Sequence, residues 1–293
     1  MNKAFTLFDG FMVGGGIIVA GLLLQTTTGG VIWDAFAWPF NAIFLAVFLV
    51  IILAIYLLGH RIDALRFLGT YKAAVPAMIY AIILTIIMGL TKQTVDGTWL
   101  NNMLAFWPLV LIYTYIAVIL GVIIIRHILH FQWKRDIPFL LNHMGLFIAL
   151  VAATLGNADF QRYKMITTIG EPEWKVLNQT NGIEELPIAI ELKKFIMETY
   201  DDGSPKRFAS NIHIYTKSGQ SFATTIDVNK PVKVEGYKIY QYGYDTHMGI
   251  MSQISILELV RDPWLPIVYT GIFMMIAGAV SLFFIGAGRR RKS

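Results

Sequence analysis

Cysteine is absent from the 293-residue sequence. Disulfide bonds, thiolate nucleophiles and cysteine-ligated metal sites are therefore excluded. Any domain that this chain places outside the cytoplasm must be held together by packing alone, because no disulfide restricts its unfolded state.

Charged residues are also scarce. They make up 15% of the chain and hydrophobic residues 56%, and both figures lie outside the usual range for a soluble domain. The net charge of +5 does not indicate nucleic-acid binding, because the basic residues gather at the ends of apolar segments and in the tail from Arg289 to Lys292. That distribution is typical of charges facing the cytoplasmic side of a bilayer. We therefore expect a lipid bilayer, and no nucleic acid, as a partner.

Six segments are candidates for membrane-spanning helices, which need about 20 mostly apolar residues. The first segment is short and could be a signal peptide, but it lacks a clear small-residue cleavage site and another apolar segment follows closely. We expect its glycines, including Gly14, Gly16 and Gly21, to allow close helix packing instead. The predicted spans are Phe11–Leu24, Phe40–Gly59, Ala73–Leu90, Leu104–Ile125, Pro138–Gly156 and Leu265–Ala287.

Lysine and arginine are unevenly distributed between the loops that join these spans. The loops 60–72 and 126–137 are basic, the loop 25–39 has no basic residue, and the loop 91–103 has only Lys92. By the positive-inside rule, both termini are cytoplasmic and the domain between the fifth and sixth spans is extracytoplasmic. The sequence therefore predicts an α-helical, multi-pass protein of the bacterial inner (cytoplasmic) membrane.

The predicted organisation has three parts: a membrane domain with five spans, a mainly β extracytoplasmic domain, and a final span with a basic cytoplasmic tail, at residues 1–156, 157–262 and 263–293. In the outer domain, the turn Lys217-Ser218-Gly219 joins two runs of alternating polarity, a pattern that indicates a β-hairpin. Whether the domain is a β-sandwich or an open barrel stays undecided at this point.

Histidine is the residue type in the spans that could carry chemistry, because acidic residues are almost missing there. His143 lies within the fifth span, about six residues or roughly 9 Å from its cytoplasmic end at 1.5 Å per residue. An ionisable group at that depth needs a partner or a ligand, and a neutral imidazole is a good axial ligand for haem iron. The alternative is a histidine that hydrogen-bonds a neighbouring helix.

Three more histidines stand at the cytoplasmic ends of spans: His60, His127 and His130. His127 and His130 are three apart, which predicts that they share one helical face. They are candidates for haem binding, and the alternative is an interfacial role near headgroups and water. His213 and His247 fall in the outer domain, and His213 alternates with isoleucines, so we expect it to face solvent.

The residues around His143 resemble a known family. The stretch Asn142-His143-Met144-Gly145-Leu146-Phe147-Ile148, followed by Leu155-Gly156, resembles the last span before the outer domain in the ResB (CcsB) family. Three further pieces follow in the family's order: Val228-Asn229-Lys230-Pro231, then Glu235-Gly236-Tyr237-Lys238-Ile239-Tyr240-Gln241 with Tyr244-Asp245, and Asp262-Pro263-Trp264 leading into Tyr269-Thr270-Gly271.

The resemblance implies a role in system II cytochrome c maturation. Such proteins pair with a CcsA-type protein, move haem from the cytoplasm to the outer face, and support its attachment to apocytochrome c. By the family motif, His143 is the axial ligand of the haem iron, and haem b is the implied cofactor. This chain departs from the family in its shorter outer domain, its extra spans and its lack of the tryptophan-rich signature of the CcsA half. We therefore expect the non-catalytic half of a haem-attachment complex.

Two other functions fit the sequence. A b-type haem subunit of a respiratory complex would stack two or more histidine pairs across the membrane, whereas the histidines here gather on one side. A non-haem membrane scaffold, with the β domain as a binding module, would tolerate replacement of His143.

Overall fold

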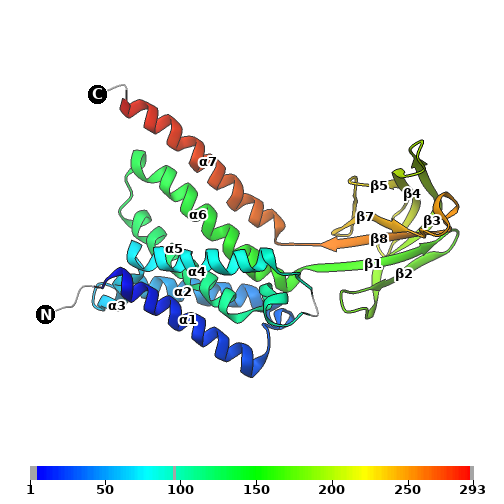
Figure 1. The fold of residues 1–293 in the computed structure, drawn as a ribbon. Helices are drawn as coiled ribbons and strands as arrows, with labels where there is room; N and C mark the ends of the chain where they lie inside the picture. The colour runs from blue at the N-terminus through cyan, green and yellow to red at the C-terminus, as the bar shows by residue number, and fades with distance from the viewer. Residues whose placement is uncertain (1–4, 95–96, 291–293) are drawn as a thin grey trace. The chain divides into compact units, whose positions relative to one another are not determined.

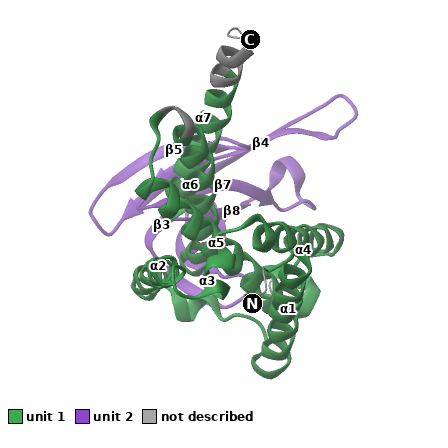
Figure 2. Ribbon diagram, turned by 90° about the vertical axis from the view of Figure 1, so that its left-hand side faces the viewer, with its two compact units in different colours: residues 1–159, 264–293 green, residues 160–263 purple. Residues whose placement is uncertain are grey.

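The chain folds into two compact units, coloured separately in Figure 2. Unit 1 comprises residues 1–159 and 264–293, and unit 2 comprises residues 160–263. The structure, a computed structural model, describes residues 5–94 and 97–290, with all of their side chains except those of 134, 135 and 284–290. Of the predicted basic tail, Arg291 and Lys292 lie outside the described residues.

Unit 1 is helical, and six of its helices in the described part of the chain are long and apolar enough to cross a membrane (Figure 1). This number confirms the six segments expected from the sequence. The long helices are α1 (Leu7–Thr28), α2 (Phe40–Leu58), α4 (Tyr71–Leu90), α5 (Trp107–Leu129), α6 (Trp133–Gly156) and α7 (Leu265–Arg290), and the short ones are α3 (Asp63–Leu68), η1 (Trp33–Phe36), η2 (Trp99–Asn101), η3 (Met103–Ala105) and η4 (Asn157–Asp159).

Glycines let α1 approach two other helices, as expected from the sequence. A Cβ added at Gly14 would lie 2.5 Å from the ring of Tyr80 in α4, and one at Gly21 would lie 2.7 Å from the backbone of Pro108 in α5. Gly16 has nothing within 4 Å of such an atom and so does not take part in this packing. The helix begins at a capping box, in which Thr6 and Asp9 bond each other's backbone N–H groups.

Helix α5 is the centre of unit 1. Within its most apolar stretch, 56% of the residues are buried, against at most 22% in the other five candidate spans. It packs against α1, α2, α4 and α6, and Gly121 of α5 meets Ile52 of α2, whose side chain is almost fully buried. The end of α5 therefore brings its polar residues close to several other helices.

Helices α6 and α7 form the most extensive helix pair. Gly271 of α7 lies against the backbone of α6, where an added Cβ would be 2.5 Å from the carbonyl oxygen of Gly145 and 2.7 Å from the backbone nitrogen of Ala149. Small residues on both helices thus allow the backbones to touch, as in other closely packed membrane helices.

Replacing Gly271 by leucine is expected to force α6 and α7 apart and to lower stability by about 1–3 kcal/mol, the usual cost of overpacking. The midpoint of thermal unfolding of the purified protein in detergent measures this effect. Gly16→Leu is the matched control, because its Cβ meets nothing within 4 Å. Equal losses in the two variants would mean that the close helix approach does not determine the stability.

One carboxylate joins three parts of unit 1. Asp159, in η4 directly after α6, accepts the backbone N–H of Trp38 at 2.8 Å, Nδ2 of Asn41 at 2.7 Å and the indole Nε1 of Trp264 at 2.6 Å. Trp38 and Asn41 lie at the start of α2, and Trp264 directly precedes α7. Segments far apart in the sequence therefore meet at this side chain.

Unit 2 is a single antiparallel sheet of eight strands in the order β5-β4-β3-β2-β1-β8-β7-β6. The sheet curls far enough for β5 to contact β7, so the domain resembles an open barrel and not a two-sheet sandwich. Its core is a single cluster of buried aliphatic side chains and tyrosines. The strands are β1 (Gln161–Thr168), β2 (Pro172–Leu177), β3 (Ile183–Thr199), β4 (Pro205–Thr216), β5 (Ser221–Asp227), β6 (Val232–Val234), β7 (Tyr237–Tyr244) and β8 (Ile254–Arg261).

The predicted hairpin is β4–β5. Ile214 pairs with Phe222 across it, and Gly219 in the turn has a φ of 86°, a conformation that favours glycine. His213 of β4, expected to face solvent, is partly buried because its ring lies against Tyr215 and its Nε2 is 2.6 Å from the hydroxyl of Ser221.

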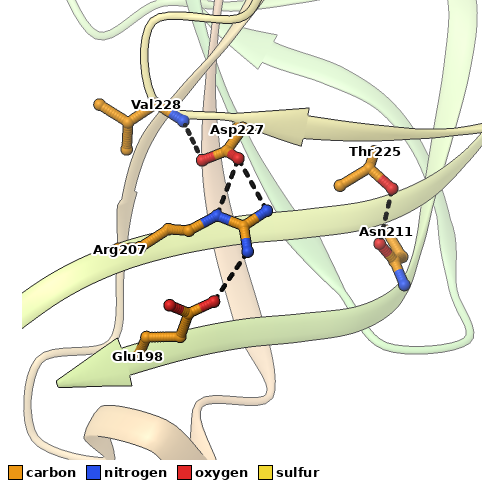
Figure 3. Close-up of polar contacts among 6 residues, drawn as sticks. All are labelled: Glu198, Arg207, Asn211, Thr225, Asp227 and Val228. Carbon is orange, nitrogen blue, oxygen red and sulfur yellow. Dashed lines mark hydrogen bonds and ion pairs between the residues drawn. The ribbon is translucent and has the colours of Figure 1, made fainter.

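An ion-pair network links three strands of unit 2 (Figure 3). Arg207 of β4 donates to Asp227 of β5 through Nε at 2.8 Å and to Glu198 of β3 through Nη1 at 2.8 Å. The hydrogen bonds from Arg207 hold the pKa of the Asp227 carboxyl below its usual range. A carboxyl with a depressed folded-state pKa stabilises the fold above its unfolded-state pKa, about 4, and that stabilisation is lost as the pH falls through the folded-state value.

Replacing Arg207 by glutamine is therefore expected to loosen the β4–β5 pairing at pH 7 and to have a smaller effect at pH 3. Hydrogen exchange of the β4 and β5 amides in the full-length protein measures the change. Lys233→Gln, at an exposed lysine of β6, is the control. An equal change at both pH values would exclude the carboxylate partners as the cause.

Candidate functional site

His143 lies one turn after Phe139 on α6. Its Nδ1 is 2.9 Å from the carbonyl oxygen of Phe139, and its ring stacks on the phenyl ring with centroids 3.8 Å apart and planes at 19°. A carbonyl only accepts hydrogen bonds, so Nδ1 carries the hydrogen and, in the neutral imidazole, Nε2 keeps its lone pair. Nε2 has no hydrogen-bond partner among the described residues. This tautomer lets Nε2 bind a metal while Nδ1 is held by a carbonyl, a common arrangement of metal-binding histidines.

His127, at the end of α5, packs on the same phenyl ring. Its centroid is 3.9 Å from that of Phe139, with the planes at 30°, and its Nδ1 is 3.3 Å from a carboxylate oxygen of the buried Asp136. One face of a phenyl ring has room for a single ring at such distances, so the imidazoles of His127 and His143 lie on opposite faces of Phe139. A carboxylate also only accepts, so in the neutral ring the Nε2 lone pair of His127 is available as well.

His60 and His130 lie away from Phe139, in a separate pocket. Both line a pocket of about 470 Å³ between α2, α3 and α5, together with Arg66 and Arg126. The Nδ1 of His130 is 3.0 Å from the carbonyl oxygen of Arg126, so His130 has the same tautomer as His143. His60 is exposed, and its ring meets Tyr56 edge to face at 5.8 Å.

The prediction that His127 and His130 share one helical face is wrong. Helix α5 ends at Leu129, and His130 is its C-cap residue with φ −116° and ψ 38°, outside the helical range. His130 lines the pocket with residues of α2 and α3, whereas His127 packs against Phe139 of α6. The four histidines of unit 1 thus lie in two places. His127 and His143 both contact Phe139, and His60 and His130 both line the pocket.

Sequence reasoning missed Phe139, Asp136 and the two pocket arginines. Phe139 could have been found from its spacing of four before His143, which places two rings on one helical face. Asp136 is fully buried at the start of α6, where a carboxylate is unusual. Among the described residues, no group of three or more histidine, aspartate or glutamate side chains lies close enough to hold a metal ion.

The segment that carries His143 has recognisable relatives. Residues 135–256 match the sequence model of the ResB-like family. This segment is ResB-like. The resemblance inferred from the sequence is thereby confirmed from α6 into β8, and the pieces at Asp262-Pro263-Trp264 and Tyr269-Thr270-Gly271 lie beyond the matched residues.

Curated proteins similar to this chain include the cytochrome c biogenesis protein CcsB from two strains of Prochlorococcus marinus. The protein of strain MED4 (subsp. pastoris) is 30% identical over 119 residues, which cover 40% of this chain and 27% of that protein. The protein of strain NATL1A is 25% identical over 128 residues, which cover 44% and 29% respectively. The chain thus spans less than a third of the length of each of these relatives.

A solved structure also aligns with the chain. It is a cytochrome c haem lyase, CcmF, and the alignment covers 96% of this chain and 46% of that one, with 12% sequence identity and a TM-score of 0.39. That similarity is too low to show a shared fold.

Proposed function

We propose that this chain is a membrane subunit of a system II cytochrome c maturation complex. It binds haem within the bilayer and, together with a CcsA-type partner, passes it to the outer face for attachment to apocytochrome c. The ResB-like match supports this role because it covers α6, the helix that carries His143, and because the relatives are named as cytochrome c biogenesis proteins.

The proposed arrangement follows the charge pattern. The six apolar helices cross the bacterial inner membrane with both termini in the cytoplasm, and residues 157–262 lie outside, where they help to hold the partner or the apocytochrome. The haem is of b type and is cargo for the complex. This chain is the non-catalytic half, and the partner contributes the site where haem becomes attached.

One observation carries the proposal: the imidazole of His143 sits in an apolar helix with Nδ1 fixed by a carbonyl and Nε2 without a partner among the described residues. A hydrogen bond to the second ring nitrogen is the usual support of a metal-binding histidine. The site therefore fits haem iron, with His143 as one axial ligand. Phe139 separates His143 from His127, so we propose that a histidine of the partner is the second axial ligand.

Purification with and without a CcsA-type partner, followed by absorption spectroscopy, tests the proposal. We expect a Soret band in the complex. Absence of haem under both conditions would contradict haem binding and favour the scaffold function. Haem in the protein together with normal cytochrome c maturation in a deletion strain would favour the respiratory b-type subunit instead.

A further inference from the structure

The pocket between α2, α3 and α5 has an apolar floor and a basic rim. Its floor is made by the buried Gly59 and Val122 and the partly buried Ile55. Its rim carries two imidazoles and two guanidinium groups on exposed side chains, namely His60, Arg66, Arg126 and His130. The volume of about 470 Å³ lies within the range of small-molecule sites. Such a pocket fits a ligand with an apolar body and anionic groups at one edge.

The two guanidinium groups differ in their surroundings. Arg66 is oriented by its neighbours, because Nη2 pairs with Asp63 at 2.5 Å and Nε donates to the carbonyl oxygen of Gly59 at 3.3 Å. The guanidinium of Arg126 makes no ion pair or hydrogen bond with the described residues. Helices α2 and α5 both end at this pocket, and their carbonyl ends add partial negative charge. A bound anion therefore depends strongly on Arg126.

The imidazoles narrow the choice of ligand. A phosphate or a fatty acid needs only the guanidinium groups, which bind oxyanions through paired N–H donors. His130 adds a ring nitrogen with an available lone pair, because its Nδ1 is held by the carbonyl oxygen of Arg126. An iron porphyrin with two carboxylate side chains matches this pocket. The ring nitrogen can bind the iron, the guanidinium groups can bind the carboxylates, and the apolar walls can contact the porphyrin ring.

We propose that this pocket is a second haem-binding site, which accepts haem before it reaches His143. Arg66 and Arg126 bind the two carboxylates, and Nε2 of His130 binds the iron. His127 is three residues before His130 and contacts the ring that stacks on His143, so the end of α5 connects the two places. This inference rests on the proposed function, which supplies haem as the cargo.

A titration separates the two sites. His143→Ala protein in detergent is titrated with ferric haem and followed by absorption, in parallel with the double variants that add Arg126→Gln or His130→Ala. We expect His143→Ala alone to bind added haem, and each added change to weaken that binding by about tenfold, the effect of losing one charge-assisted bond or one ligand. Arg61→Gln is the matched control, because Arg61 is an exposed arginine next to His60 in the chain that does not line the pocket.

Haem dimethyl ester, in which both carboxylates are masked, tests the role of the arginines directly. We expect it to bind His143→Ala protein about as weakly as haem binds the variant with Arg126→Gln. Equal binding of haem and its ester, or equal binding by all variants, would overturn the inference. A second result would also overturn it: Arg126→Gln changes retention of phosphatidylglycerol but not of haem, which would identify a lipid site.

Different results would contradict the second haem site and the proposed function. If wild-type protein carries haem that depends on His143 while the pocket variants bind added haem normally, only the second site is excluded. If neither the wild type nor any variant binds haem, the proposed function fails as well. All of the changed side chains on the pocket rim are exposed, so we expect each variant to fold. The midpoint of thermal unfolding checks that it does.

Discussion

Replacing His143 by alanine is expected to remove the haem that co-purifies with the complex, with a loss of more than about tenfold in haem per protein. Even a lost supporting bond to a metal-binding residue typically costs 10–100-fold in affinity, and loss of the ligand itself should cost at least as much. The hydrogen bond and the ring contact of the partly buried side chain both lie within α6, so the change removes the ligand without breaking a hydrogen bond between helices of the described residues. The pyridine haemochrome assay measures the haem content.

His213→Ala is the matched control, since His213 lies on a strand of unit 2 and bonds Ser221. It should leave the haem content unchanged. His143→Gly with added imidazole provides a rescue: the free base can occupy the vacated ligand position and restore the Soret band. A Soret band of full intensity in His143→Ala would exclude His143 as the ligand.

Replacing Asp159 by alanine is expected to lower the stability of unit 1 by about 3 kcal/mol or more, because hydrogen bonds to a charged group contribute roughly 1.5–3 kcal/mol each and are not fully additive. The change removes one acceptor from the backbone N–H of Trp38, the amide of Asn41 and the indole of Trp264. Asn41 is fully buried, so water cannot readily replace the lost bond. The unfolding midpoint in detergent measures the loss.

Two further variants sharpen this test. Asp159→Asn keeps the size but offers one acceptor oxygen in place of two, so we expect an intermediate loss. Asp34→Ala removes an exposed carboxylate from η1 of the same unit and should have almost no effect. Similar midpoints for Asp159→Ala and Asp34→Ala would mean that the three donors do not hold the helices together.

The sequence predicted the elements whose signal is local. Long apolar runs identify the candidate spans, and alternating polarity around Gly219 identifies the β4–β5 hairpin. His143 was identifiable because a histidine inside an apolar helix stands out from its neighbours. These features depend on a few adjacent residues and not on how the chain folds.

The parts that escaped prediction depend on tertiary packing. Arg66 and Arg126 looked like ordinary loop charges that set orientation, and only the packing of α2, α3 and α5 brings them to one pocket. His130 has a different set of neighbours from His127 because it is the C-cap residue of α5, and helix ends are poorly determined by apolar patterns. The contact of Phe139 with His143 is local to α6, whereas its contact with His127 depends on the packing of α5 against α6.

Maturation of a reporter cytochrome tests the central claim most directly. The reporter, with a CxxCH motif, is expressed in a bacterium that lacks its own maturation system, with a CcsA-type partner and with or without this chain. Covalently bound haem is detected by peroxidase staining after denaturing electrophoresis. We predict that staining requires this chain and is lost with His143→Ala. Full staining without the chain, or unchanged staining with His143→Ala, would contradict a haem-handling role in cytochrome c maturation.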